Sequence, residues 1–361
     1  MTFTLKNLTS LIQVALTHNA SDVHLRTDET PSLRIKGELV PVQTKNFSAE
    51  DIYEIISILL HGKNIDHELA KNLEIDGAFQ LEQICRLRFN IFRYFHQYGI
   101  VLRIIQSNIP TLQSLNMPPI LAKISQQRKG LILITGPTGS GKSTTMSAML
   151  EHINTESASH IITIEDPIEY LHPQKKSRIS QREVGKDTLS FADGLRAALR
   201  QDPDVISIGE LRDAETVQIA LKAAETGHLV ISTMHTSNTI TTINRIISFF
   251  PTVEQIEVRN RLAESLYAVV GQMMLKGKNG SMLVAQEIML TNPGIKDCIL
   301  GKDDINRIHQ IINQGLGKSI NGCQTFDHHV MQLFNKGLIS KEVAQSAVSS
   351  ERDFLQKLII E

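Results

Sequence analysis

The chain has 361 residues, of which 41% are hydrophobic and 21% charged, and its formal net charge is −1. This composition is ordinary for a soluble globular protein, and the length favours two or three domains with buried cores. A chain this close to neutrality has no overall field that draws it to nucleic acid or to an anionic membrane. Its cysteines, Cys85, Cys298 and Cys323, form no C-x-x-C pair, which argues against a zinc module and a disulfide framework and fits a reducing compartment.

The N-terminus has no charged segment followed by a long apolar run, so the sequence predicts no signal peptide. No uncharged apolar run approaches the ~20 residues that are needed to span a bilayer. We therefore expect a cytoplasmic protein without direct membrane insertion, which reaches a membrane only through a protein partner.

The first third of the chain combines helical and strand-like patterns. Apolar residues at helical spacing predict an amphipathic helix over residues 5–18, and Ser48 as N-cap predicts a second helix over residues 49–60. Short strand-like runs lie before and after this second helix. Together these elements predict an α+β domain over residues 1–106.

Four arginines of this domain stand out on its later strands: Arg86, Arg88, Arg93 and Arg103. The simplest interpretation is that they are solvated charges on exposed strand faces. The alternative is that they act in trans on a triphosphate bound by a neighbouring subunit, since a planar guanidinium suits the charge that develops during phosphoryl transfer. The sequence leaves both interpretations open.

A proline-rich stretch predicts a linker over residues 107–120. Beyond it, helical patterns alternate with continuous apolar runs, at residues 131–135, 160–164, 204–208 and 229–233. Continuous runs indicate strands that are buried on both faces, hence a mainly parallel sheet covered by helices. We expect this α/β core to span residues 121–290 and a helical C-terminal subdomain to span residues 291–361.

Residues 136–143 match the pattern G-x-x-x-x-G-K-[ST] of a phosphate-binding loop (P-loop), between an apolar strand-like run and a helix-prone stretch. The glycines let successive N–H groups point at one phosphate chain, and the helix adds its positive N-terminal end. Lys142 would bind the β- and γ-phosphates, and the Ser143 hydroxyl would bind Mg²⁺. The residues expected to bind ATP are Gly136, Pro137, Thr138, Gly139, Ser140, Gly141, Lys142, Ser143 and Thr144.

Carboxylates follow two of the predicted buried strands, Glu165 directly and Glu210 after Gly209. Glu165 would polarise the attacking water with support from Asp166 or Glu169, because the carboxyl ends of parallel strands face the ligand crevice. The alternative is that these acidic residues cap a helix or turn. Glu210 is the candidate for organising Mg²⁺ through a bound water. Spacing does not decide which of Glu165 and Glu210 is the base and which serves the metal.

Two histidines, His228 and His235, bracket the strand-like run at residues 229–233. A lone histidine is most simply a structural residue. However, the cluster Ser-Thr-Met-His-Thr that contains His235 follows a strand next to a P-loop, which favours a sensor of the γ-phosphate.

These segments resemble the secretion-superfamily ATPases, and nearly end to end the chain resembles the type IV pilus retraction (twitching motility) ATPases of the PilT type. The resemblance lies in residues 134–144, 164–170, 181–188, 198–206, 209–213, 223–230 and 233–236, with weaker matches at 20–25 and 322–327. It implies a PAS-like N-terminal domain and a RecA-like ATPase core in a homo-hexameric ring, with ATP bound between the two domains.

The resemblance also implies roles for single residues. Glu165 would be the catalytic base, Glu210 would serve the magnesium site, and the histidines and N-terminal arginines would be functional, namely His228, His235, Arg86, Arg88 and Arg103. The implied activity is ATP hydrolysis that powers pilus retraction. The implied partners are an integral-membrane pilus platform at the inner membrane and a paralogous retraction ATPase, with no nucleic acid.

Two segments depart from the family pattern. Asn-Arg-Gly after the first arginine pair appears here as Phe95-His96-Gln97, which removes one arginine that Arg93 would have to replace. The retraction signature Ala-Ile-Arg-Asn-Leu-Ile-Arg-Glu is replaced by Gly-Ile-Lys-Asp-Cys-Ile-Leu-Gly at residues 294–301. An accessory or regulatory paralogue with weak hydrolysis, or a related type II/IV secretion ATPase, therefore stays open as an alternative. The pilus assembly ATPase is disfavoured because its cysteine-rich zinc insertion has no counterpart here.

Overall fold

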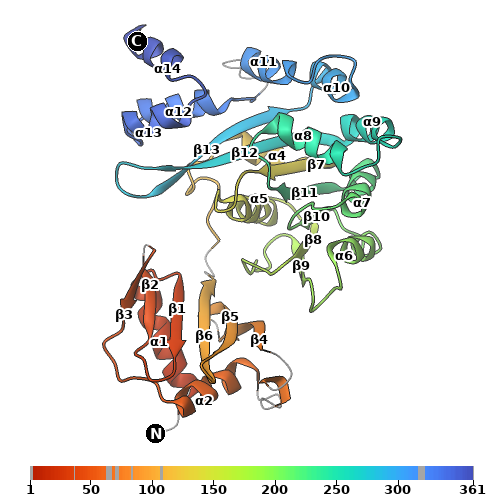
Figure 1. The fold of residues 1–361 in the computed structure, drawn as a ribbon. Coiled ribbons are helices and arrows are strands. Elements are labelled where there is room, and N and C mark those ends of the chain that lie inside the picture. Colours follow the sequence, from red (N-terminus) through yellow and green to blue (C-terminus); the bar gives the residue numbers. More distant parts are fainter. Residues whose placement is uncertain are drawn as a thin grey trace. The chain divides into compact units, whose positions relative to one another are not determined.

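A computed structural model describes residues 3–35, 37–61, 67–69, 73–82, 84–105, 109–315 and 322–360. The chain divides into two compact units, Met1–Asn108 and Ile109–Glu361 (Figure 1). Each unit has a hydrophobic core of its own. Of the predicted linker, residues 107 and 108 lie outside the described part, and residues 109–119 contain no helix or strand.

The first unit is an antiparallel sheet of six strands with two long helices, in the order β3-β2-β1-β6-β5-β4. Its elements are α1 (Leu5–Thr17), β1 (Asp22–Arg26), β2 (Ser32–Ile35), β3 (Glu38–Pro41), α2 (Ala49–Leu59), β4 (Glu74–Leu81), β5 (Cys85–Tyr94) and β6 (Gln97–Ile105). Ser48 caps α2 as predicted, because its hydroxyl accepts from the N–H of Asp51 at 3.2 Å. The α+β arrangement predicted from the sequence is confirmed.

The second unit is built on a sheet of seven strands, in the order β13-β12-β7-β11-β10-β8-β9. The strands are β7 (Gly130–Thr135), β8 (His160–Glu165), β9 (Arg178–Glu183), β10 (Val205–Ile208), β11 (Leu229–Met234), β12 (Leu266–Lys276) and β13 (Met282–Leu290). All pair in parallel except β13, which runs antiparallel to β12. The four predicted apolar runs form β7, β8, β10 and β11, whereas β9 and the β12–β13 hairpin were not predicted as strands.

Helices cover both faces of this sheet (Figure 1). They are α4 (Ile120–Ser125), α5 (Lys142–Glu156), α6 (Phe191–Ala198), α7 (Ala214–Glu225), α8 (Thr239–Ser248), α9 (Gln255–Ser265) and α10 (Pro293–Leu300). Leu131 and Leu133 of β7 join the core formed with α6 to α10, while Ile132 and Ile134 join the core formed with α4 and α5. Because successive residues of a strand point to opposite faces, a strand covered on both sides reads as one continuous apolar run.

The C-terminal part is helical, with α11 (Arg307–Gln314), α12 (Phe326–Asn335), α13 (Lys341–Ala347) and α14 (Glu351–Ile360). Helix α12 packs on β13 through a small core that includes Ala285, Val330 and Leu333. His329 of α12 is buried there, and its Nδ1 accepts a hydrogen bond from the N–H of Gln286 at 2.9 Å. In the described part of the chain, no helix combines the length and the apolar character that crossing a bilayer requires.

This packing predicts an acid-sensitive attachment of α12. Burial, with smaller contributions from Lys336 and His328, lowers the pKa of His329 from 6.5 to about 4. As the pH falls from 6.5 towards about 4, the unfolded chain binds the His329 proton before the folded chain does, so this histidine destabilises the fold progressively in that window.

We expect His329→Asn, whose side-chain oxygen can still accept from Gln286, to lose less thermal stability over this window than the wild type. Calorimetric melting of both full chains across the window measures the difference. If the melting temperatures of the two proteins fall equally over this window, protonation of His329 does not cause the loss of stability.

Candidate functional site

The P-loop joins the buried strand β7 to helix α5, as the sequence predicts. Gly136 has φ +153, and a Cβ there would lie 2.4 Å from Ser140 Oγ and 2.5 Å from the carbonyl oxygen of Gln272. Gly139 and Gly141 also have positive φ values, of +79 and +85, which L side chains rarely adopt. The loop conformation therefore depends on its glycines.

The loop has the features of an anion site. Among the described residues, no side chain caps the N-terminus of α5, and none lies within 4 Å of the position that a Cβ on Gly139 would take. Ser140 Oγ is buried and has no hydrogen-bond partner in the described part of the chain. Uncapped N–H groups at a helix N-terminus attract phosphate. The residues present therefore fit a nucleotide phosphate chain.

Lys142, the first residue of α5, is buried at 7% exposure. Its Nζ donates to the carbonyl oxygens of Gly136 at 2.9 Å and Pro137 at 3.0 Å. Burial lowers the pKa of Lys142, while the carboxylates of Glu210 and Glu169 act in the opposite direction. The ammonium thus lies on the loop itself with two of its three donors used. Ser143 and Thr144 follow in the first turn of α5.

Glu210 and His235 lie beside the P-loop at the carboxyl ends of β10 and β11. His235 connects the P-loop to Glu210. Its Nδ1 lies 3.5 Å from Thr138 Oγ1 of the loop, and its Nε2 lies 3.5 Å from Glu210 Oε2. The other oxygen of Glu210 pairs with Arg212 at 2.6 Å, and Arg212 also reaches Asp166 at 3.5 Å. The structure therefore brings Glu210 and His235 to the loop, linked by polar contacts.

Glu165 ends β8, the neighbour of β10, and its carboxylate is held by several donors. Thr163 Oγ1 donates to Oε1 at 2.6 Å, Gln181 Nε2 donates to Oε1 at 3.0 Å, and the N–H of Glu169 donates to Oε2 at 3.4 Å. Burial raises the pKa of Glu165, the hydrogen bonds lower it, and Glu169 raises it further. Since the charge of Glu169 acts on both Glu165 and Lys142, these side chains belong to one electrostatic neighbourhood.

His228 lies at the other end of β11 from His235. Its Nδ1 is 3.0 Å from the carbonyl oxygen of Ala223 and 3.2 Å from Thr226 Oγ1. Because β7 and β11 are parallel, the P-loop and His235 share the carboxyl end while His228 stands at the amino end. The structure therefore does not bring His228 to the P-loop within one chain.

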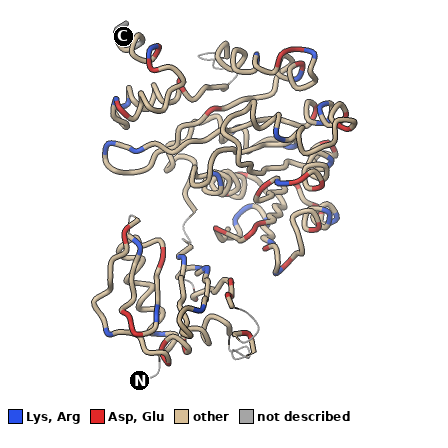
Figure 2. The backbone as a smooth tube through the Cα atoms, in the orientation of Figure 1, with Lys and Arg blue, Asp and Glu red and all other residues tan. Residues whose placement is uncertain are grey.

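The predicted arginines belong to the first unit, whereas the P-loop belongs to the second. Arg86 and Arg88 alternate on β5 with buried apolar residues, so they project from the sheet face opposite the core, and Arg88 pairs across the strands with Arg103. Figure 2 marks the Lys and Arg positions of this unit in blue. Arg103 Nε donates to Asp22 Oδ1 at 2.9 Å. Arg88 and Arg103 are exposed, and Arg93 lies over the ring of Tyr98 at 5.5 Å.

Sequence reasoning missed two residues of the site, Thr163 and Gln181. They stand opposite each other on β8 and β9, and both donate to Glu165. Gln181 opens the family-like segment at residues 181–188, but its contact with Glu165 follows only from the pairing of β8 with β9.

The chain is similar in sequence to a protein family and to pilus ATPases of known name. The family model described as "Type II/IV secretion system protein" matches residues 2–337. The chain is 38% identical to the type IV pilus retraction ATPase PilT of Pseudomonas aeruginosa, over 96% of this chain and 100% of that protein. It is 36% identical to the type IV pilus ATPase PilU of the same organism, over 95% of this chain and 89% of that protein.

The fold has a counterpart among solved structures. The crystal structure of the pilus retraction motor PilT with bound ADP matches it with a TM-score of 0.87 and 37% identity, over 99% of this chain and 100% of that one. The chain therefore belongs to the type II/IV secretion system protein family and has the fold of its pilus retraction ATPases.

Proposed function

We propose that this chain is an ATP-hydrolysing motor that powers type IV pilus retraction. The observation that carries the proposal is the P-loop with Lys142 on it and with Glu210 and His235 beside it, while Glu165 ends β8 on the same edge of the sheet. The similarity to the pilus retraction ATPase PilT, in sequence and in fold, supports the assignment to pili.

The N–H groups of the P-loop and the first turn of α5 bind the phosphates of ATP, and Lys142 stabilises the charge that develops on them. The Ser143 hydroxyl would bind Mg²⁺, and Glu210 would hold it through a bound water, since oxygen ligands are those that Mg²⁺ prefers. Bound Mg²⁺ would neutralise phosphate charge. His235, which already contacts Thr138 of the loop and Glu210, is the sensor of the γ-phosphate.

Glu165, rather than Glu210, is the base in this proposal. Glu165 has no cation among the partners that its carboxylate contacts in the described residues, and burial raises its pKa, which strengthens a general base. Glu210 is instead paired with Arg212. Glu165 would accept the proton of the water that attacks the γ-phosphate, with Thr163 and Gln181 holding the carboxylate.

The proposal extends to assembly and location. In this proposal a homo-hexamer forms, and the arginines of one subunit act on the nucleotide of its neighbour. The arginines are Arg86, Arg88 and Arg103, which lie on the face of the first unit's sheet that is opposite its hydrophobic core. The ring would act in the cytoplasm on the platform protein at the inner membrane. His228 would contribute across a subunit contact, because it does not reach the P-loop of its own chain.

A second candidate is an accessory retraction ATPase, because identity to PilU is close to identity to PilT, at 36% and 38%. Two departures from the retraction pattern favour it. Phe95 and His96 form the exposed turn between β5 and β6. The replaced signature at residues 294–301 lies on α10, where Ile295, Cys298 and Ile299 are buried. The complete P-loop and both glutamates argue for an active enzyme.

Deletion of the gene in the organism that carries it tests the proposed function. We expect surface pili to persist but no longer to retract, and expression of the wild-type chain to restore retraction. Glu210→Gln should still bind ATP yet fail to restore retraction, because a neutral amide organises Mg²⁺ poorly. Retraction rates of single pili measure both outcomes.

Undiminished retraction in the deletion strain would favour the accessory role. Restoration by Glu210→Gln would mean that binding of ATP, without hydrolysis, suffices.

Mixed rings test whether Arg88 acts in trans. Lys142→Ala and Arg88→Ala should each be inactive alone, and a mixture should recover part of the wild-type ATPase rate, because some interfaces then pair an intact Lys142 with an intact Arg88. Arginines of this kind contribute about 10³–10⁵ in rate. Steady-state phosphate release measures the recovery, and none in verified mixed rings would mean that Arg88 has no such role.

A further inference from the structure

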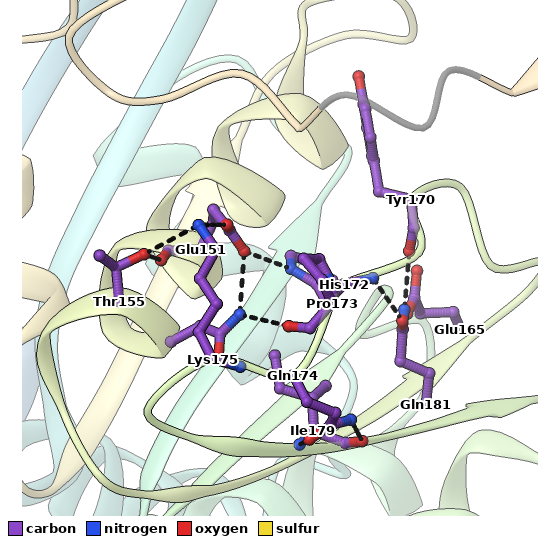
Figure 3. Close-up of polar contacts among 11 residues, drawn as sticks. Glu151, Thr155, Glu165, Tyr170, His172, Pro173, Gln174, Lys175, Ile179 and Gln181 are labelled. Carbon is purple, nitrogen blue, oxygen red and sulfur yellow. Dashed lines mark hydrogen bonds and ion pairs between the residues drawn. The ribbon is translucent and has the colours of Figure 1, made fainter. Parts of the chain in front are cut away.

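Gln181 makes three hydrogen bonds with its side-chain amide, and one of them goes to Glu165. Its Nε2 donates to Glu165 Oε1 at 3.0 Å and to the carbonyl oxygen of Tyr170 at 2.8 Å, and its Oε1 accepts from the N–H of His172 at 2.8 Å (Figure 3). The two backbone contacts fix which way the amide faces, since the NH₂ must face a carbonyl and the oxygen must face an N–H. The amide can therefore present only its N–H to Glu165.

The backbone that holds Gln181 is itself attached to α5, the helix that follows the P-loop. Tyr170 Oη lies 3.2 Å from Thr144 Oγ1, His172 Nδ1 lies 3.4 Å from Glu151 Oε2, and the side chain of Asn154 donates to the carbonyl oxygen of Pro173 at 2.8 Å (Figure 3). Figure 3 draws the contacts of His172 and Pro173 but not that of Tyr170 with Thr144. The three contacts run along α5 from its first turn to its fourth. Residues 170–173 are therefore fixed on α5, and they in turn fix the amide of Gln181 relative to this helix.

The Glu151 end of this attachment is buried. Glu151 and His172 are 7% and 8% exposed, and Lys175 forms an ion pair with the same carboxylate (Figure 3). Burial lowers the pKa of His172, so its ring is neutral near neutral pH and can donate to Glu151. A buried, hydrogen-bonded contact of this kind holds the segment in one geometry.

We propose that Gln181 is a positioning residue for catalysis, which fixes the orientation of the Glu165 carboxylate relative to the P-loop helix. This inference rests on the proposed role of Glu165 as the base. Hydrogen bonds to a carboxylate also favour its ionised form, and here those from Thr163 and Gln181 oppose burial and the charge of Glu169. Gln181 therefore keeps Glu165 both oriented and ready to accept a proton.

Gln181→Glu in the full chain tests this role. The variant retains an oxygen that can accept from His172 but loses both donors. We expect kcat for ATP hydrolysis to fall by about tenfold to hundredfold, because the base is misplaced. KM for ATP should change by less than about threefold, since the P-loop is untouched. The acidic limb of the kcat–pH profile should move to higher pH, because Glu165 then binds its proton more tightly.

Gln174→Glu is the matched control. Gln174 also braces this segment, with its side chain donating to the carbonyl oxygen of Ile179 at 2.8 Å and accepting from the N–H of Ile179 at 2.9 Å, but it does not contact Glu165. It should keep the wild-type kcat and pH profile. If Gln181→Glu does not fold, Gln181→Met removes the same donors without adding charge, and the same changes are expected.

Two results would overturn the inference. One is a wild-type kcat and pH profile in the Gln181 variant. The other is an equal loss of kcat in Gln174→Glu, which would mean that Gln181 only stabilises the backbone around it. Glu165→Gln separates this failure from a failure of the proposed function. If Glu165→Gln hydrolyses ATP at the wild-type rate, Glu165 is not the base. If it is inactive while Gln181→Glu is normal, only the role of Gln181 is lost.

Discussion

The first turn of α5 must keep its backbone N–H groups uncapped, and the rest of the second unit makes this possible. A helix that begins without a side-chain cap gives up stabilisation that a serine or aspartate would supply. The packing of α5 compensates, since Met149, Leu150 and Ile153 are buried against the sheet. On the other side of the loop, β7 is fixed by parallel pairing with both β11 and β12. The loop is therefore held at both ends, and its open N–H groups remain available for phosphate.

The strand order decides which side chains can join the loop. From β7 the sheet continues through β11, β10, β8 and β9, all parallel, so their carboxyl ends form one edge. His235 directly follows β11, the strand next to β7, and contacts the loop, and Glu210 and Glu165 follow along the same edge. This is the edge at which ligands bind in open α/β sheets. The topology therefore gathers residues that are far apart in the sequence.

Much of this arrangement could be predicted from the sequence, because it rests on local patterns. Continuous apolar runs identified four core strands, the P-loop motif is contiguous, and Glu165 and Glu210 stand at or just beyond the ends of their strands. Long-range pairing was beyond such patterns. Gln181 reaches Glu165 only because β9 lies beside β8, and the polar sequence of β9 does not resemble a buried strand.

The two histidines illustrate the same limit. His228 and His235 lie at either end of one strand, and their spacing does not say which end faces the P-loop. Because β7 and β11 pair in parallel, the end of β11 that His235 follows lies at the P-loop. The arginines of the first unit could be assigned to one sheet face by alternation, but their approach to a nucleotide depends on subunit assembly, which no local pattern encodes.

The central claim is that the site at this sheet edge hydrolyses the ATP that it binds. The most direct test is a single-turnover measurement with the wild-type chain in excess over ATP and Mg²⁺ present. The account predicts that the bound ATP is converted to ADP and phosphate without another protein. Recovery of the bound ATP unchanged would contradict it, and would leave the chain as a nucleotide-binding subunit whose Glu165 and Glu210 do not perform the chemistry.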